Sequence, residues 1–240
     1  MIFLLQKPLN FIVIVSVILT TALLHVSAQD TDFIKIGKSD WTGSVFGDVG
    51  GADKITIENF EITQPKDGTY VLRSSYSRGK IASTSEGIAY LYKRIPLDRD
   101  FEMTVTAEVM SFDMNNQVSF GIMLRDTVYK NESLKENLGS YLAVGPVDIT
   151  KEPAMFVFYR TPSETTVKTG DIKFNPKPVA GTKFEISLEK SGNDYILIYG
   201  NEEPLKLKSF NIFNGKDLFI GLFTSRNTKV TFTNLSLDIK

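Results

Sequence analysis

Hydrophobic and polar residues alternate with a period of two along most of the chain after Asp40. The clearest stretch is 116–125, which carries Val118, Phe120, Ile122 and Leu124 on one side and Gln117, Ser119, Met123 and Arg125 on the other. Successive side chains of a β-strand point to opposite faces, so this pattern predicts a strand with one face between the sheets and one polar face outside. Residues 101–109 alternate in the same way.

Further strands are predicted at 69–74, 87–94, 140–144, 155–159, 183–190, 194–199, 217–223 and 230–239. The segments 155–159 and 217–223 are apolar enough to be buried on both faces. Turn residues separate the strands at Lys66-Asp67-Gly68, at 191–194 and at Asn214-Gly215, and the one predicted helical turn lies near 132–137. Many short strands with turns between them predict an all-β fold, an antiparallel two-sheet β-sandwich of the jelly-roll type. We expect the closing strand, 230–239, to pair beside the N-terminal strand.

The first 28 residues have the features of a secretory signal peptide. Lys7 precedes an apolar run from Phe11 to Leu24, and small residues follow at Val26-Ser27-Ala28. This run is shorter than the roughly 20 residues that a membrane-spanning helix needs. We therefore expect a signal peptide at 1–28, a secreted mature protein with one β-sandwich domain at 29–240, and no membrane association after cleavage.

Composition narrows the chemistry that the mature chain can perform. The single histidine, His25, lies in the signal segment, and the chain has no cysteine. Imidazole bases, thiolate nucleophiles and soft metal sites are therefore excluded from residues 29–240. The formal net charge of −1 gives no global field that would attract nucleic acid. These features favour binding over catalysis and leave the oligomeric state open.

Several runs together resemble a known type of module. They are Phe46-Gly47-Asp48-Val49-Gly50-Gly51, Leu72-Arg73-Ser74-Ser75, Arg78-Gly79-Lys80-Ile81, Glu86-Gly87-Ile88-Ala89-Tyr90, Asn115-Asn116-Gln117-Val118-Ser119-Phe120-Gly121, Leu124-Arg125-Asp126 and Leu138-Gly139-Ser140-Tyr141. In this order they resemble the concanavalin A-like (laminin G-like) β-sandwich modules of secreted bacterial polysaccharide-degrading proteins, which often accompany pectate-lyase-type domains. The resemblance implies a concanavalin A-like jelly roll with a carbohydrate-binding or enzyme-accessory role.

The polar side of the predicted strands supplies a candidate saccharide site. Aromatic rings stack on sugar rings, amides and hydroxyls bond to sugar hydroxyls, and an arginine fork matches a uronate carboxylate. The candidate ligand-binding residues are Arg73, Arg78, Lys80, Tyr90, Gln117, Ser119, Arg125, Tyr141, Tyr159, Arg160 and Arg226. We expect Arg78, Arg125, Tyr90 and Tyr159 to share one concave sheet face. An ordinary solvated sheet face is the competing interpretation.

A glycine-rich run offers a candidate cation site. Asp48 and Asp53 lie among the glycines of 47–53, where a tight loop can supply the oxygen ligands that Ca²⁺ prefers. Asp238 would join them if the two ends of the chain are adjacent. The spacing does not match an EF-hand loop, and a simple glycine turn is the alternative.

No catalytic residue stands out. Glycosidases of the same sandwich class place convergent acids at alternate strand positions, as in Glu-x-Asp-x-x-Glu, and no such run occurs in the sequence. The sole tryptophan, Trp41, is interpreted as a core or cap residue before it is considered as a sugar platform. Of the two Asn-x-Ser sequons, Asn131 is expected in a loop open to glycosylation and Asn234 in a strand.

We conclude from the sequence that the chain is a secreted carbohydrate-binding β-sandwich whose partner is a polysaccharide or oligosaccharide, with pectin as one candidate. Calcium is the one expected cofactor, in a structural role. The alternatives are a small lyase or hydrolase that acts on glycans without histidine, and a structural or adhesive surface protein.

Overall fold

The computed structural model describes residues 33–37, 39–75, 81, 86–113, 117–135, 138–148, 153–154, 156–163, 167–168 and 177–240. The predicted signal segment, and with it the expected cleavage site, lies outside the described residues. Asp32–Lys240 forms one compact unit. Its described part contains no α-helix, only strands and a short 3₁₀ helix, η1, at Ala52–Lys54. No helix in this part has the length and apolar character needed to cross a bilayer.

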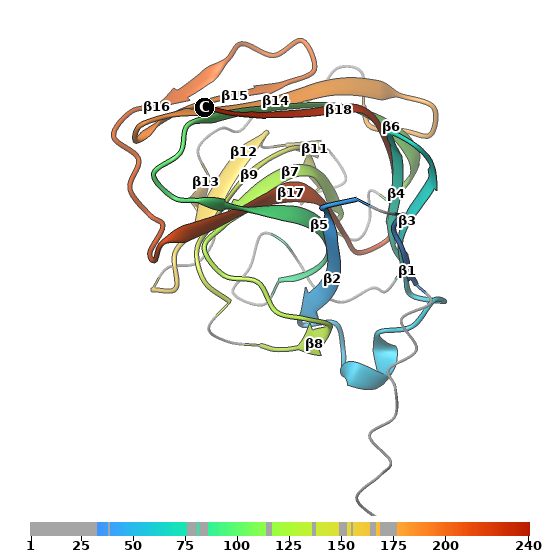
Figure 1. The fold of residues 1–240 in the computed structure, drawn as a ribbon. Coiled ribbons are helices and arrows are strands. Elements are labelled where there is room, and N and C mark those ends of the chain that lie inside the picture. Colours follow the sequence, from blue (N-terminus) through green and yellow to red (C-terminus); the bar gives the residue numbers. More distant parts are fainter. Residues whose placement is uncertain are drawn as a thin grey trace, which may run out of the picture. The chain divides into compact units, whose positions relative to one another are not determined.

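Two sheets face each other (Figure 1). The eight-stranded sheet has the order β1-β3-β4-β18-β6-β14-β15-β16, with strands β1 (Ile34–Lys35), β3 (Phe60–Lys66), β4 (Thr69–Ser74), β18 (Thr228–Ile239), β6 (Phe101–Phe112), β14 (Lys183–Ser191), β15 (Asp194–Tyr199) and β16 (Leu205–Leu207). The ten-stranded sheet runs β13-β12-β9-β7-β17-β5-β2-β8, with strands β13 (Val167–Lys168), β12 (Val157–Arg160), β9 (Tyr141–Val144), β7 (Ser119–Arg125), β17 (Asp217–Ser225), β5 (Gly87–Pro96), β2 (Thr42–Gly47) and β8 (Glu132–Ser133). Two short strands, β10 (Val147–Asp148) and β11 (Pro153–Ala154), join it beside β7.

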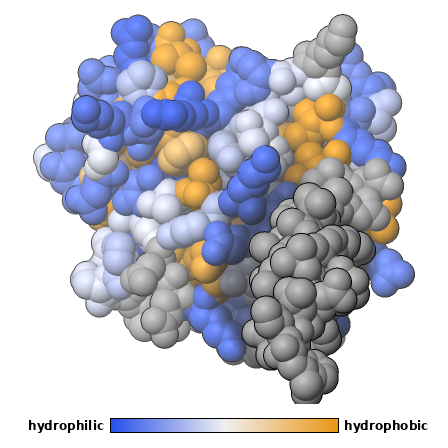
Figure 2. Space-filling model, turned by 60° about the horizontal axis from the view of Figure 1, so that its bottom comes forward, coloured by the Kyte–Doolittle hydropathy of each residue, from blue (hydrophilic) through white to orange (hydrophobic). Residues whose placement is uncertain are grey.

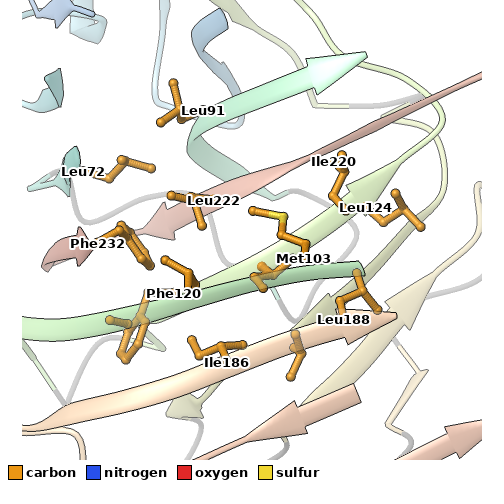
Figure 3. Packing of buried hydrophobic residues seen from close by; sticks show 14 of the residues in the cluster. Leu72, Leu91, Met103, Phe120, Leu124, Ile186, Leu188, Ile220, Leu222 and Phe232 are labelled. Atoms are coloured by element: carbon orange, nitrogen blue, oxygen red, sulfur yellow. The ribbon is translucent and has the colours of Figure 1, made fainter. Parts of the chain in front are cut away.

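The space between the sheets is filled by an inter-sheet core. Strand β6 buries every second residue from Phe101 to Val109, and the pattern is repeated by β14, whose Phe184, Ile186 and Leu188 face the same way. Phe120, Ile122 and Leu124 of β7 meet them from the opposite sheet. Figure 3 shows Met103, Ile186 and Leu188 of one sheet on the side that faces Phe120 and Leu124 of the other. The period-two pattern in the sequence therefore identifies the face of each strand that is buried between the sheets.

The predicted two-sheet all-β fold is confirmed, and most of its strands begin and end close to their predicted positions. The expected place of the closing strand is wrong. Strand β18 pairs with β4 and β6 in the middle of the eight-stranded sheet, whereas β1 pairs in parallel with β3 at the sheet edge. The predicted helical turn near 132–137 is replaced at Glu132–Ser133 by β8, which pairs with β2.

Candidate functional site

The ten-stranded sheet is buried on both faces. The side chains that point away from the inter-sheet core form a second core, which consists of Phe46, Ile81, Ile88, Tyr90, Met123, Tyr141, Ala143, Val147, Phe158 and Phe223. Val128 and Tyr129, from the segment that follows β7, pack against it. The face that the sequence predicts to be a solvated sugar platform is therefore covered by chain segments.

A buried ion triad lies at the edge of this second core. The carboxylate of Glu86, just before β5, lies 2.5 Å from Nη2 of Arg125 and 2.9 Å from Nη1 of Arg160. The side chains of Glu86 and Arg125 have no exposed area. A charged side chain that is buried away from water is stable only when a group of opposite charge lies beside it. The triad therefore depends on all three side chains being in place. It joins the ends of β5, β7 and β12.

Arg125 also fixes the segment that covers the sheet. Its Nε donates to the carbonyl oxygen of Thr127 at 3.0 Å, and its Nη2 donates to that of Leu138. Its guanidinium lies 5.1 Å from the ring centroid of Phe46 and 5.6 Å from that of Tyr141. The hydrogen-bond donors, the positive charge and the ring contacts of the Arg125 guanidinium are thus all used within the protein. Arg125 is therefore not available to bind the carboxylate of a ligand.

The tyrosines of the second core are held by backbone groups. The Tyr90 hydroxyl lies 2.9 Å from the carbonyl oxygen of Met123 and 2.7 Å from that of Phe219. The Tyr141 hydroxyl donates to the carbonyl oxygen of Ile81 at 2.7 Å. Burial raises the pKa of Tyr90 well above the usual tyrosine value. A phenol that is neutral and already hydrogen-bonded is poorly suited to act as a general base.

The predicted register of β7 is correct, but its exposure is not. Phe120, Ile122 and Leu124 belong to the inter-sheet core, and Met123 belongs to the second core. Ser119, expected to be solvated, is fully buried and donates to the carbonyl oxygen of Pro146 at 2.7 Å. The alternation of hydrophobic and polar residues shows on which face of the strand a side chain lies. It does not show whether another part of the chain covers that face.

The four residues expected on one concave face are not brought together. Tyr90 and Arg125 lie on the second-core side of the sheet, whereas Tyr159 packs against the inter-sheet core and Phe210 at a ring-centroid distance of 4.9 Å. Arg78 lies outside the described residues, as does Lys80. Arg160 belongs to the buried triad.

Arg73 belongs to the outer face of the other sheet. On β4, its Nη1 donates to the carbonyl oxygen of Glu58 at 2.6 Å and to the Ser75 hydroxyl at 2.7 Å. Its Nε lies 3.4 Å from the Glu61 carboxylate, which also receives Nζ of Lys229 at 3.1 Å. Arg73 therefore joins β4 to the segment before β3.

This cluster predicts an acid-sensitive contribution to stability. Burial acts to raise the pKa of Glu61, but hydrogen bonds and charge from Lys229, with Thr63 and Arg73, outweigh it and lower the pKa below 4.5. A carboxylate whose pKa is lower in the folded than in the unfolded state stabilises the fold at any pH above its unfolded-state pKa. This contribution is lost as the pH falls through the folded-state pKa. In thermal melts between pH 6 and about pH 3, Glu61→Gln should lose less stability than the wild type, by up to about 1 kcal/mol because the group is partly exposed. Equal acid sensitivity of the two proteins would contradict this assignment.

Gln117 and Arg226 lie at one end of the sandwich. Ser119, two residues after Gln117, pairs with Ser225, next to Arg226. Burial lowers the pKa of Arg226, and the charge of Asp113 opposes this shift. Near this end a hollow of about 320 Å³ is lined by Arg73, Ser75, Ser111, Phe112, Asp113, Asn227 and Thr228. Arg73, Gln117 and Arg226 are half-buried, and none of them belongs to the second core.

The three candidate calcium ligands do not form a cluster. Gly47 ends β2 opposite Gly87, and the Asp48 amide donates to the carbonyl oxygen of Glu86 at 2.6 Å. Asp53 lies in η1 with its carboxylate 2.8 Å from Lys54 Nζ, and Asp238 pairs opposite Glu102 in the other sheet. Among the described residues, no three acidic or histidine side chains are close enough to share a metal ion.

The glycine run has a structural role in this arrangement. A Cβ on Gly47 would lie 1.9 Å from the carbonyl oxygen of Glu86, so only glycine permits the strands to approach so closely. This close approach fixes the backbone of the residue that carries the central carboxylate of the triad.

The two sequons are exposed in the opposite order to that expected. Asn131 is buried, and its Oδ1 accepts a hydrogen bond from the Val45 amide at 3.1 Å. A glycan on Asn131 is incompatible with this packing. Asn234 is exposed at a bulge of β18, where its φ of 53° turns it out of the regular ladder.

Two other surface hollows have about twice the volume of the one beside Arg73. The first, the Trp41 hollow, has a volume of about 730 Å³ and is lined by Gly37, Ser39, Asp40, Trp41, Gln64, Lys66, Asp67 and Tyr70. The second, the Lys190 hollow, has a volume of about 620 Å³ and is lined by Leu97, Asp98, Lys190, Gly192, Asn193, Gly215 and Lys216. The Trp41 hollow contains both an indole and a phenol.

Sequence reasoning missed Glu86 as a functional residue of the fold. It occurs in the sequence as a single acid before a strand, more than 30 positions from Arg125 and more than 70 from Arg160. Only the topology, which places β5, β7 and β12 in one sheet, brings the three side chains together. The indole of Trp41 and the turn at Lys66-Asp67-Gly68 were both visible in the sequence, but their proximity in one hollow was not.

Comparison with known proteins relates the chain to parts of larger enzymes. It is 30% identical over 218 residues to pectate lyase L of Thermoclostridium stercorarium, and 24% identical over 224 residues to the pectate disaccharide-lyase of Dickeya chrysanthemi. The matches cover 89% and 78% of this chain but only 16% and 30% of the two relatives. No family model matches the chain.

Solved structures show the same fold at low sequence identity. Arcelin-5, a lectin-like defence protein of Phaseolus vulgaris, aligns with a TM-score of 0.53 at 9% identity over 87% of this chain and 96% of its own. Lectin II of Ulex europaeus aligns with a TM-score of 0.53 at 8% identity over 84% and 93% of the two chains. The chain is therefore a concanavalin A-like β-sandwich, similar in sequence to a segment of larger pectate lyases.

Proposed function

We propose that this chain is a secreted carbohydrate-binding module that recognises a polysaccharide of pectin-containing material. The observation that carries the proposal is the 30% identity to pectate lyase L, which extends over 89% of this chain yet takes up 16% of that enzyme. A segment of this size within a much larger lyase fits a module that attaches the enzyme to its substrate.

The geometry favours binding over catalysis. Of the side chains that could supply a lyase with a base and a charge-neutralising group, Arg125 and Tyr90 lie in the described part of the chain and are already occupied. Arg125 is paired with Glu86, and the neutral Tyr90 hydroxyl contacts backbone carbonyls. Proton abstraction next to a uronate carboxylate needs a free base and a group that neutralises the carboxylate.

Affinity electrophoresis in gels containing polygalacturonate, pectin or a neutral galactan tests the proposal. We expect the purified chain to be retarded in at least one pectic gel relative to a gel without polysaccharide, while bovine serum albumin is not. An assay of ultraviolet absorbance from unsaturated uronate products, run in parallel, is expected to stay at the level of the buffer. Retardation in no gel would refute the proposed function, and product formation would replace it with lyase activity.

A further inference from the structure

We infer that the Trp41 hollow is a saccharide subsite that takes an uncharged, hydroxyl-rich sugar unit. The inference rests on the proposed function, because it names the place and the chemistry of binding for a chain that binds glycans. The hollow is lined on one side by the segment between β1 and β2, which includes Trp41, and on the other by the β3–β4 hairpin. Its volume of about 730 Å³ lies within the roughly 300–1,000 Å³ of small-molecule sites.

The aromatic part of the hollow is fixed before any ligand arrives. Trp41 and Tyr70 have ring centroids 6.3 Å apart and planes inclined at 55°. Nζ of Lys93 lies 5.2 Å from the Trp41 ring centroid and 2.5 Å from Oδ2 of Asp40. Trp41 remains partly exposed, so an apolar ring surface is available at little ordering cost.

The polar part of the hollow is suited to sugar hydroxyls. Gln64 accepts a hydrogen bond from the Gly37 amide at 3.1 Å through Oε1, and its Nε2 lies 3.5 Å from Oδ1 of Asp67. The side chain of Asp40 is 75% exposed, and that of Asp67 is also exposed. Carboxylate oxygens accept strongly from hydroxyl groups, and the amide donates to hydroxyl oxygens.

The balance of charges around the hollow favours a neutral sugar over a uronate. Burial raises the pKa of Tyr70, and the negative charges of Asp67 and Asp40 raise it further. Asp40 is paired with Lys93, and Asp67 lines the hollow together with Lys66, so the hollow offers no excess positive charge that would attract a uronate carboxylate. Figure 2 shows one face of the molecule, on which hydrophilic residues surround separate groups of hydrophobic residues.

The chain contains one tryptophan, so its fluorescence reports directly on this hollow. Neutral galacto-oligosaccharides and oligogalacturonates are titrated separately into the full chain while indole emission and iodide quenching are recorded. We expect the neutral series to shift the emission and reduce quenching, and the charged series to do so at least ten times more weakly.

Variants locate the site without relying on the indole alone. Asp67→Ala and Gln64→Ala are expected to weaken binding of the neutral series at least tenfold in calorimetric titrations, with unchanged melting temperatures. Trp41→Phe should also weaken it, although this residue packs against the core and its melt must be checked. The matched control is Asp98→Ala, an exposed carboxylate in the Lys190 hollow, and it should bind like the wild type.

The outcomes separate this inference from the proposed function. If the wild type is retarded in pectic gels but its indole emission stays constant and Asp67→Ala binds normally, the Trp41 hollow is not the site and the proposed function stands. Loss of binding in Asp98→Ala with retention in Asp67→Ala would place the site in the Lys190 hollow. If oligogalacturonates bind as tightly as the neutral series, the assigned ligand class is wrong.

Discussion

Replacing Glu86 with alanine will lower the free energy of unfolding by about 3–5 kcal/mol, because two arginines lose their buried counter-charge. Glu86 lies 2.5 Å from Arg125 and 2.9 Å from Arg160, and its side chain has no exposed area. An unpaired guanidinium in this environment keeps its charge and must recruit water or shift the surrounding chain. Urea denaturation followed by circular dichroism measures the effect.

The control for this variant is Asp217→Ala, which removes the exposed ion pair to Arg94. Exposed pairs contribute about 0–1 kcal/mol, so its midpoint should stay close to the wild type. A loss in Glu86→Ala no larger than in Asp217→Ala would show that water reaches the triad. The triple variant Glu86→Leu, Arg125→Met, Arg160→Leu should recover part of the lost stability, because it leaves no charge unpaired. The recovery is incomplete because the carbonyl oxygens of Thr127 and Leu138 lose their donor.

Replacing Phe120 with alanine will cost about 3–5 kcal/mol, the usual range for a buried phenylalanine. Its ring lies within 5.8–6.5 Å of the rings of Phe112, Phe184 and Tyr199, which belong to the opposite sheet. Truncation leaves a cavity between the sheets that these rings cannot fill without leaving their own positions. Thermal and urea unfolding give the change.

Met110→Ala is the matched control, since Met110 is 48% exposed on β6 of the facing sheet. Its free energy of unfolding should change by no more than about 0.5 kcal/mol. If Phe120→Ala is as mild as Met110→Ala, the ring does not fill the inter-sheet core and the register of β7 must be reassigned.

The fold could be predicted because local pattern determines the faces of these strands. Strands β4 and β15 begin and end at the predicted residues, and β6, β7, β14 and β17 overlap their predictions closely. Strand β2 was missed because its residues, Thr42–Gly47, are rich in small residues and continue into a glycine run. The central position of β18 depends on pairing with strands more than 100 residues earlier, which no local pattern reports.

The candidate site was predicted less well, for a physical reason. Arginine and tyrosine on the polar side of a strand suit a sugar platform, and they suit equally well a buried layer in which guanidinium, phenol and carboxylate satisfy one another. Arg125 and Tyr141 belong to such a buried layer. The segment that follows β7 determines which of the two arrangements forms, because it covers the sheet and supplies the carbonyl oxygens of Thr127 and Leu138.

The position of β18 has a consequence for the order in which this protein can fold during synthesis. Its residues, 228–239, are made last among the described strands, yet they separate β4 from β6. Until they leave the ribosome, these two strands present unpaired edges and the inter-sheet core lacks Val230 and Phe232. The eight-stranded sheet therefore closes only after synthesis of this segment, so the nascent chain depends on protection from aggregation until then.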